Sequence, residues 1–140
     1  MIIGTGVDIV KTERFKKAVL PLSEGSEGGA SPRFLVRAFS PREQAYLSAK
    51  GPQSMAGLFA AKEAVVKALG TGFAGFFPCD VEILRGISGK PYVVLHGKAK
   101  EVLKKLVLVP YPLRRRCFSI SVSISHSETD AIAFAVLERV

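Results

Sequence analysis

The sequence has little cysteine and no long apolar run. Its two cysteines, Cys79 and Cys117, lie far apart and show no Cys-x-x-Cys spacing, so a structural disulfide or zinc site is not expected. No apolar run reaches the roughly 18 residues that a membrane-spanning helix needs. Residues 1–8 lack the basic region and apolar run of a signal peptide, and we therefore expect a cytoplasmic protein with no membrane partner.

Several common catalytic signatures are missing as well. The chain has neither a Gly-x-Ser-x-Gly elbow nor a Walker loop. Gly4-x-Gly6 lacks the third glycine and the helix start of a dinucleotide fingerprint. These absences argue against elbow-type hydrolases, P-loop enzymes and dinucleotide-binding domains.

Acidic residues are outnumbered by basic ones. The 140 residues include 20 Lys and Arg against 12 Asp and Glu, a formal net charge of +8. This charge predicts an acidic partner: a nucleic acid, an acidic protein or a phosphate-rich cofactor. Because 48% of the residues are hydrophobic, the chain can form a packed core, and its length predicts one domain over residues 1–140.

The hydrophobic pattern alternates between strand and helix periods, which predicts an α+β domain with helices packed on one face of a largely antiparallel sheet. Ser40, Pro41 and Glu43 form a capping-box start for one helix, and Gly51-Pro52 is expected to end it. The expected strands are 2–10, 81–84, 91–95, 118–124 and 131–137. The expected helices are 11–20 with Thr12 as N-cap, 40–49, 54–69 and 98–108, and the expected loops include 21–32 and 109–116.

The helix predicted over residues 54–69 carries charged residues that could do chemistry. Glu63 and Lys67 are spaced i, i+4 and so share one helix face, just before the turn Gly70-Thr71-Gly72. This pattern suits a metal ion beside a phosphate, although a surface ion pair is the simpler interpretation of the pattern taken alone. Asp8, at the end of a buried-looking strand, is either a capping aspartate or a second carboxylate for Mg²⁺.

His126 and the Gly89-Lys90-Pro91 segment each allow two interpretations. His126 lies in a turn after an apolar strand, where a histidine is either a hydrogen-bonded surface residue or a phosphate or proton contact. Gly89-Lys90-Pro91 is either a plain hairpin turn or a backbone that lies against an extended ligand.

Taken in order, four motifs resemble those of the holo-acyl-carrier-protein synthases. They are Gly6-Val7-Asp8-Ile9-Val10, the stretch from Phe59 to Gly72, Gly89-Lys90-Pro91, and Ser123-Ile124-Ser125-His126-Ser127. The resemblance covers the chain apart from residues 21–32 and 109–116. It implies a phosphopantetheinyl transferase-like domain that transfers 4′-phosphopantetheine from coenzyme A to a serine of apo acyl carrier protein and releases adenosine 3′,5′-bisphosphate.

The resemblance also implies roles for single residues. Asp8 and Glu63 would hold Mg²⁺, and with Lys67, which would contact a phosphate, they would be the catalytic residues. The family assembles as trimers with active sites between subunits, which implies a homotrimer. The residues expected at the coenzyme A site are Lys62, Lys67, Gly72, Gly89, Lys90, Pro91, His126 and Ser127.

Acyl carrier proteins are acidic, so the resemblance implies that basic residues near the N-terminus dock the carrier. Arg14 matches a basic position of the family and would dock the carrier with Lys11 and Lys17.

One departure from the family pattern is Leu58, where many members have Arg. The Arg114-Arg115-Arg116 run is a candidate replacement. The alternative, a small basic nucleic-acid-binding domain, explains the charge but leaves Asp8 and Glu63 unexplained and lacks the aromatic pattern of RNA-binding sheets.

Overall fold

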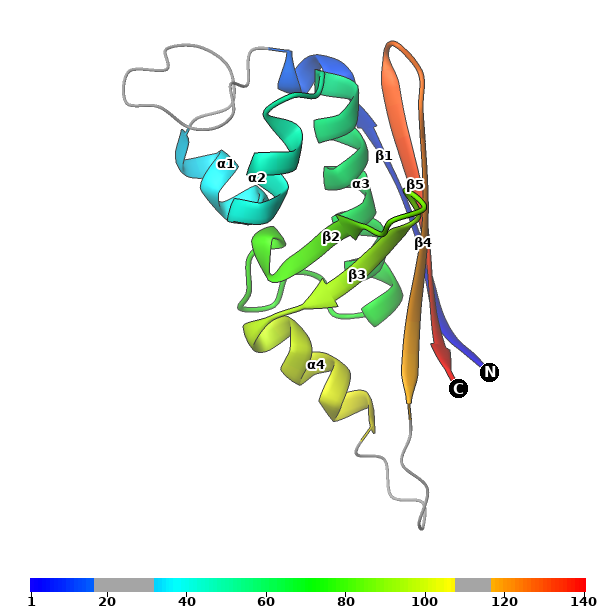
Figure 1. The fold of residues 1–140 in the computed structure, drawn as a ribbon. Helices are drawn as coiled ribbons and strands as arrows, with labels where there is room; N and C mark the ends of the chain where they lie inside the picture. The colour runs from blue at the N-terminus through cyan, green and yellow to red at the C-terminus, as the bar shows by residue number, and fades with distance from the viewer. Residues whose placement is uncertain (17–31, 108–116) are drawn as a thin grey trace.

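The computed structural model describes residues 1–16, 32–107 and 117–140. Two antiparallel sheets and a set of helices make up the domain (Figure 1). Its elements in chain order are β1 (Ile2–Lys11), η1 (Thr12–Phe15), α1 (Pro32–Ala38), α2 (Pro41–Leu47), α3 (Pro52–Leu69), η2 (Pro78–Asp80), β2 (Val81–Arg85), β3 (Pro91–Leu95), α4 (Gly97–Val107), β4 (Phe118–His126) and β5 (Asp130–Arg139).

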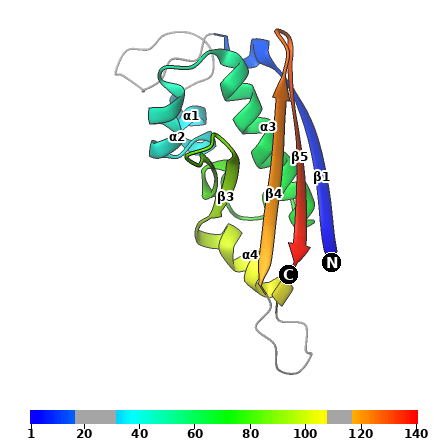
Figure 2. The same ribbon diagram turned by 45° about the vertical axis from the view of Figure 1, so that its right-hand side comes forward.

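The larger sheet has the strand order β1-β5-β4, with both neighbouring pairs antiparallel. The β2–β3 hairpin forms the second sheet, and β3 lies beside β4. Figures 1 and 2 show the helices and this hairpin on one side of the three-stranded sheet. The predicted α+β class, with helices on one face of a largely antiparallel sheet, is therefore confirmed.

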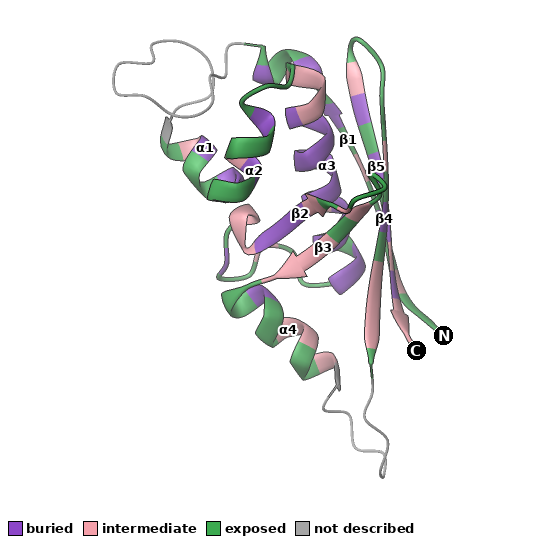
Figure 3. Ribbon diagram, in the orientation of Figure 1, coloured by how far each residue is buried: buried purple, intermediate pink, exposed green. Residues whose placement is uncertain are grey.

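Helix α3 is the centre of the core, and it packs on β1, β5 and β4 (Figure 3). Between Met55 and Leu69 every residue is buried except Glu63 and Lys67. A helix that is apolar nearly all round is one that is enclosed by other elements, and polar groups within it need a specific reason. The two exceptions are the acid and the cation that the sequence placed on one face.

Strand β1 lies unusually close to α3 because two of its inward positions are glycines. A Cβ atom added to Gly4 would lie 2.1 Å from the Ala68 carbonyl oxygen, and one added to Gly6 would lie 1.9 Å from that of Ala64. These distances are far below van der Waals contact, so only glycine permits this approach. The same face of β1 carries Asp8, which is thereby held against α3.

The other face of the three-stranded sheet is covered by none of the described residues. Its exposed side chains include many large apolar ones: Ile3, Val7, Ile9, Ile132 and Phe134. Strand pairing places Val7 opposite Phe134 and Ile9 opposite Ile132, so these four side chains are neighbours, and Ile3 is on the same face farther along β1. We call these five residues the outer sheet patch. Separately, no helix among the described residues is both long and apolar enough to cross a membrane.

Most element boundaries agree with the sequence-based expectations. The capping box is present, because the Glu43 amide donates to Ser40 Oγ over 3.2 Å and the Ser40 amide donates to Glu43 Oε2 over 2.8 Å. Helix α3 ends at Gly70, whose φ of +77° is the left-handed cap that glycine favours.

Two expectations about helix ends were wrong. Gly51 does not end α2, which stops at Leu47; it is the N-cap of α3, and Pro52 is the first helical residue, where its missing N–H costs nothing. Of the helix predicted over 11–20, the described part is the short 3-10 turn η1, capped at Lys11 rather than Thr12. Thr12 Oγ1 instead donates to the Glu128 carbonyl over 2.6 Å. Residues 17–31 and the loop predicted over 109–116 lie outside the described residues. The loop predicted over 21–32 was wrong at its last residue, because Pro32 begins α1.

Candidate active site

The structure brings Asp8 and Glu63 to one cavity. Asp8 faces α3 from the inner side of β1, and Glu63 faces outward from α3. Both line a cavity of about 410 Å³, together with residues of β1, η1 and α3, namely Ile9, Val10, Lys11, Arg14 and Phe59. Residues 55 positions apart in the sequence thus present two carboxylates to the same space.

The electrostatics of this cavity favour a cation between the carboxylates. Partial burial raises the pKa of Glu63, and the negative charge of Asp8 raises it further, while Lys67 and Arg14 oppose the rise. One or two carboxylates are the usual protein contribution to a Mg²⁺ site, where substrate phosphates and waters complete the coordination. Among the described residues no group of three or more His, Cys, Asp or Glu is placed to hold a metal, so a pair of carboxylates is the donor set on offer.

Lys67 already neutralises part of this charge. Its Nζ donates to Asp8 Oδ1 over 2.7 Å and to the Val7 carbonyl over 2.9 Å. The Lys67 side chain is 52% exposed and that of Asp8 is 17% exposed, so the pair lies at the open edge of the site. The sequence pattern had paired Lys67 with Glu63 on one helix face; the ion pair that forms is across to β1.

Arg14 forms a wall of the same cavity. Its guanidinium lies 4.7 Å from the ring centre of Phe59 and 5.0 Å from that of Phe34, and these rings cluster with Phe15. Stacking on aromatic faces holds an arginine in place while leaving its N–H groups free to bind an anion. Lys11 also lines the cavity, but its Nζ pairs with Asp130 Oδ1 over 3.0 Å. Lys17 lies outside the described residues.

Lys62 does not belong to this site, and its expected contact with coenzyme A is corrected by the structure. Its side chain is completely buried, and its Nζ donates to Glu43 Oε2 over 2.7 Å and to the carbonyls of Val81 and Pro78 over 2.7 and 3.1 Å. An ammonium has three donors, and all three are used. Burial lowers the pKa of Lys62, an effect that Glu43 opposes. Lys62 therefore joins α3 to α2 and β2 instead of facing a ligand.

The other residues expected at the cofactor site do not line the Asp8–Glu63 cavity of the same chain. Gly89 and Lys90 are at the exposed turn between β2 and β3, where Gly89 has a φ of +78°, and Pro91 begins β3. Gly72, with a φ of +60°, is in the turn after α3. Gly89 and Lys90 thus supply exposed backbone at the turn of the predicted hairpin, and Gly72 is exposed in the turn after α3.

His126 and Ser127 lie at the end of β4. His126 is exposed and pairs with Ala131 of β5, which in turn pairs with Val10 of β1. Because neighbouring strands are about 4.8 Å apart, His126 lies roughly 10 Å across the sheet from β1. Ser127 Oγ accepts from the backbone amides of Thr129 and Asp130, so it stabilises the turn.

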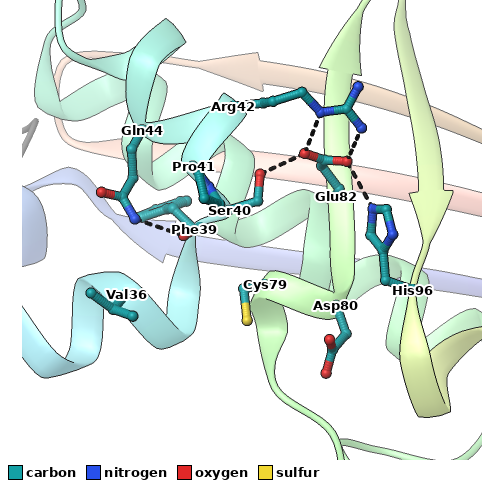
Figure 4. Close-up of a pocket in the computed structure, with 10 residues that line it drawn as sticks. All are labelled: Val36, Phe39, Ser40, Pro41, Arg42, Gln44, Cys79, Asp80, Glu82 and His96. Atoms are coloured by element: carbon teal, nitrogen blue, oxygen red, sulfur yellow. Dashed lines mark hydrogen bonds and ion pairs between the residues drawn. The ribbon is translucent and has the colours of Figure 1, made fainter.

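A polar cluster that the sequence interpretation missed surrounds Glu82 of β2 (Figure 4). Its carboxylate accepts from Ser40 Oγ over 2.6 Å and from Arg42 Nε over 3.0 Å, is also paired with an Arg42 terminal nitrogen, and lies 2.8 Å from His96 Nε2. Burial alone raises the pKa of Glu82, but the hydrogen bonds from Arg42, Ser40 and His96 lower it to about 2. The carboxylate is thus ionised and fully paired.

The Glu82 cluster borders a second cavity of about 400 Å³ and ties α2 to the β2–β3 hairpin. The available signal was a glutamate between Val81 and Ile83 in an apolar strand, since a buried charge requires partners. The sequence offered no means to identify those partners, because Ser40 and Arg42 are some 40 residues away.

Comparison with known proteins gives a consistent result. The chain matches the family described as the 4′-phosphopantetheinyl transferase superfamily over residues 4–121. It is 44% identical to "Holo-[acyl-carrier-protein] synthase" of Clostridium perfringens over 99% of this chain and 95% of the relative. It is also 44% identical to the protein of that name from Clostridium kluyveri, over 99% of this chain and 91% of the relative.

Solved structures agree with the sequence relatives. The Helicobacter pylori holo-[acyl-carrier-protein] synthase in complex with coenzyme A is 31% identical, covers 96% of this chain and 99% of its own, and has a TM-score of 0.71. The Neisseria meningitidis holo-[acyl-carrier-protein] synthase is 28% identical over 99% of each chain, with a TM-score of 0.74. These proteins do not support the alternative of a nucleic-acid-binding domain.

Proposed function

The chain belongs to the holo-acyl-carrier-protein synthases of the 4′-phosphopantetheinyl transferase superfamily, as its motifs predicted, and from this premise we propose that it uses Asp8 and Glu63 to hold Mg²⁺. It is a phosphopantetheinyl transferase, with coenzyme A as co-substrate and acyl carrier protein as acceptor. We propose adenosine 3′,5′-bisphosphate as the second product, since it is what remains when phosphopantetheine leaves coenzyme A.

One observation carries the metal assignment: two carboxylates from different elements share a cavity, and burial and the charge of Asp8 raise the pKa of Glu63. A bound Mg²⁺ would offset the charge that builds on the pyrophosphate during transfer. Asp8 and Glu63 supply the fixed negative charge that would hold the metal. Asp8 is positioned by strand β1, which packs closely on α3 through Gly4 and Gly6. The open side of the cavity leaves room for phosphate oxygens.

The remaining residues of the site are proposed to bind and orient coenzyme A. Lys67 directs an ammonium toward the cavity edge, where it would contact a phosphate and stabilise the leaving group. His126, Ser127 and the exposed turns at Gly72 and at Gly89-Lys90-Pro91 would contact the rest of the cofactor.

We propose that three copies of the chain form the active unit and contact each other through the outer sheet patch. An exposed apolar patch on an otherwise well-packed domain is typical of an interface. Assembly also explains why His126 and the 89–91 turn do not line the Asp8–Glu63 cavity of their own chain, because a neighbouring copy can supply them. Light scattering is expected to give three times the chain mass, and a charged substitution such as Phe134→Glu is expected to reduce both mass and activity.

Carrier docking is proposed at the basic rim of the cavity. Arg14, held on its aromatic cluster, and Lys11 would meet acidic residues of the carrier, with Lys17 as a further expected contact. Interactions of this kind steer association and depend on ionic strength.

The test of this function compares Asp8→Asn and Glu63→Gln with Glu101→Gln, which removes an exposed acid on α4 away from the cavity. Phosphopantetheine transfer to apo acyl carrier protein is measured at saturating Mg²⁺. Both site variants should lose the activity while the Glu101 variant keeps it. Transfer at the wild-type rate by either site variant would contradict the assignment.

A further inference from the structure

Lys67 holds one of the two carboxylates that are proposed to bind Mg²⁺. Of its three N–H donors, one goes to Asp8 Oδ1 and one to the Val7 carbonyl, and the side chain is half exposed. Among the described residues, in contrast, Glu63 forms no ion pair, and burial raises its pKa. Of the two proposed metal ligands, the described structure therefore gives Asp8 a cation of its own.

This arrangement conflicts with simultaneous metal binding. Mg²⁺ binds carboxylate oxygens at about 2.1 Å. With the metal on Asp8 Oδ1, an ammonium nitrogen 2.7 Å from that oxygen would lie within about 5 Å of the metal, and the two cations would repel each other. This repulsion favours release of Asp8 by the ammonium, whose bond to the Val7 carbonyl can keep it at the site.

We propose that Lys67 is the counter-cation of Asp8 in the metal-free enzyme, and that its ammonium passes from Asp8 to a phosphate of coenzyme A when the divalent cation binds. This inference rests on the proposed metal site. Metal binding without coenzyme A then displaces an ion pair and is weakened, whereas coenzyme A offers the released ammonium a new anion. Lys67 thereby couples the two binding events, and the coupling is reciprocal.

The experiment measures Mn²⁺ binding, as a probe for Mg²⁺, by the electron paramagnetic resonance signal of the free ion. The proteins are wild type, Lys67→Met and Lys11→Met. The Lys11 variant is the matched control, because Lys11 lines the same cavity and carries the same charge but pairs with Asp130 instead of Asp8. Each is measured with and without coenzyme A.

Without coenzyme A, Lys67→Met should bind Mn²⁺ about three- to tenfold more tightly than wild type, since it loses an exposed ion pair and a like-charged neighbour of the metal. Lys11→Met should gain clearly less. With coenzyme A the advantage of Lys67→Met should vanish or reverse, because the phosphate then lacks its ammonium partner.

Equal or weaker Mn²⁺ binding by Lys67→Met without coenzyme A would overturn the exchange, as would an equal gain in Lys11→Met. Asp8→Asn separates this failure from that of the metal site. If Asp8→Asn weakens Mn²⁺ binding, the site stands whatever Lys67 does. If Mn²⁺ binding is independent of Asp8, the metal site and the exchange are both overturned.

Discussion

Replacing Gly6 by alanine is a direct test of how the fold positions the two carboxylates. The added Cβ would lie 1.9 Å from the Ala64 carbonyl oxygen, where ordinary contact begins at 3.4 Å. Strand β1 and helix α3 would have to separate by about 1.5 Å to relieve the overlap. Gly6 is two residues from Asp8, and Ala64 is next to Glu63, so the separation would fall on the proposed metal site.

Two effects are expected from Gly6→Ala. Overpacking a tight contact costs about 1–3 kcal/mol, and a backbone-to-backbone overlap puts this substitution at about 3 kcal/mol or above. A catalytic group that is displaced by about 1 Å lowers the rate about 100-fold. Urea denaturation measures the first effect, and the rate of phosphopantetheine transfer at saturating Mg²⁺ measures the second.

Two further glycine variants make the test specific. Gly4→Ala creates a similar overlap, with Cβ 2.1 Å from the Ala68 carbonyl oxygen, but four residues from Asp8; it should lose comparable stability and less activity. Gly86→Ala, whose nearest atom among the described residues is the Lys90 carbonyl oxygen at 3.7 Å, should keep wild-type stability. If Gly6→Ala unfolds at the wild-type urea concentration and stays fully active, the close approach of β1 to α3 does not position the site.

Three other predictions follow from charges in the structure. Because burial and the charge of Asp8 raise the pKa of Glu63, the acid limb of the pH–activity curve should lie at a higher pH than an ordinary carboxyl would give. Protons and metal compete for Glu63, so more Mg²⁺ should move this limb to lower pH. An acid limb that does not move with Mg²⁺ would argue against this competition. Glu82, with its pKa lowered to about 2, stabilises the fold above the ordinary glutamate pKa, and this stabilisation is lost as the pH falls toward 2. Glu82→Gln should therefore lower the free energy of unfolding by about 3 kcal/mol at pH 7. Unchanged urea denaturation of this variant would refute the prediction. Arg14→Ala should raise the KM for the carrier several-fold, leave kcat nearly unchanged and flatten the dependence of KM on salt; an unchanged KM would exclude docking at Arg14.

Local signals in the sequence were sufficient for most elements. The capping box at Ser40 and the glycine stop at Gly70 act within one turn of helix, and both occur as predicted. Gly51-Pro52 was misassigned because the same dipeptide suits the end of one helix and the start of the next. Only the position of the following core residues, from Met55 onward, decides between them.

The sequence was sufficient for those site residues whose exposure is decided by their position within their own helix. Glu63 and Lys67 are the two residues that are not buried between Met55 and Leu69, and their spacing alone puts them on one face. Lys62 precedes Glu63 directly, yet points into the core, where its partner Glu43 is 19 residues away. A motif shows which residues are needed, and only the packing shows which of them face the ligand.

The central claim, Mg²⁺-dependent transfer of phosphopantetheine at the Asp8–Glu63 site, is tested most directly by intact-mass spectrometry. Apo acyl carrier protein is incubated with the protein and coenzyme A, with Mg²⁺ or with EDTA. We predict that the carrier gains the mass of one phosphopantetheine group with Mg²⁺ and gains nothing with EDTA. An equal gain in EDTA would contradict the metal site, and no gain with a panel of apo carriers in Mg²⁺ would contradict the transfer itself.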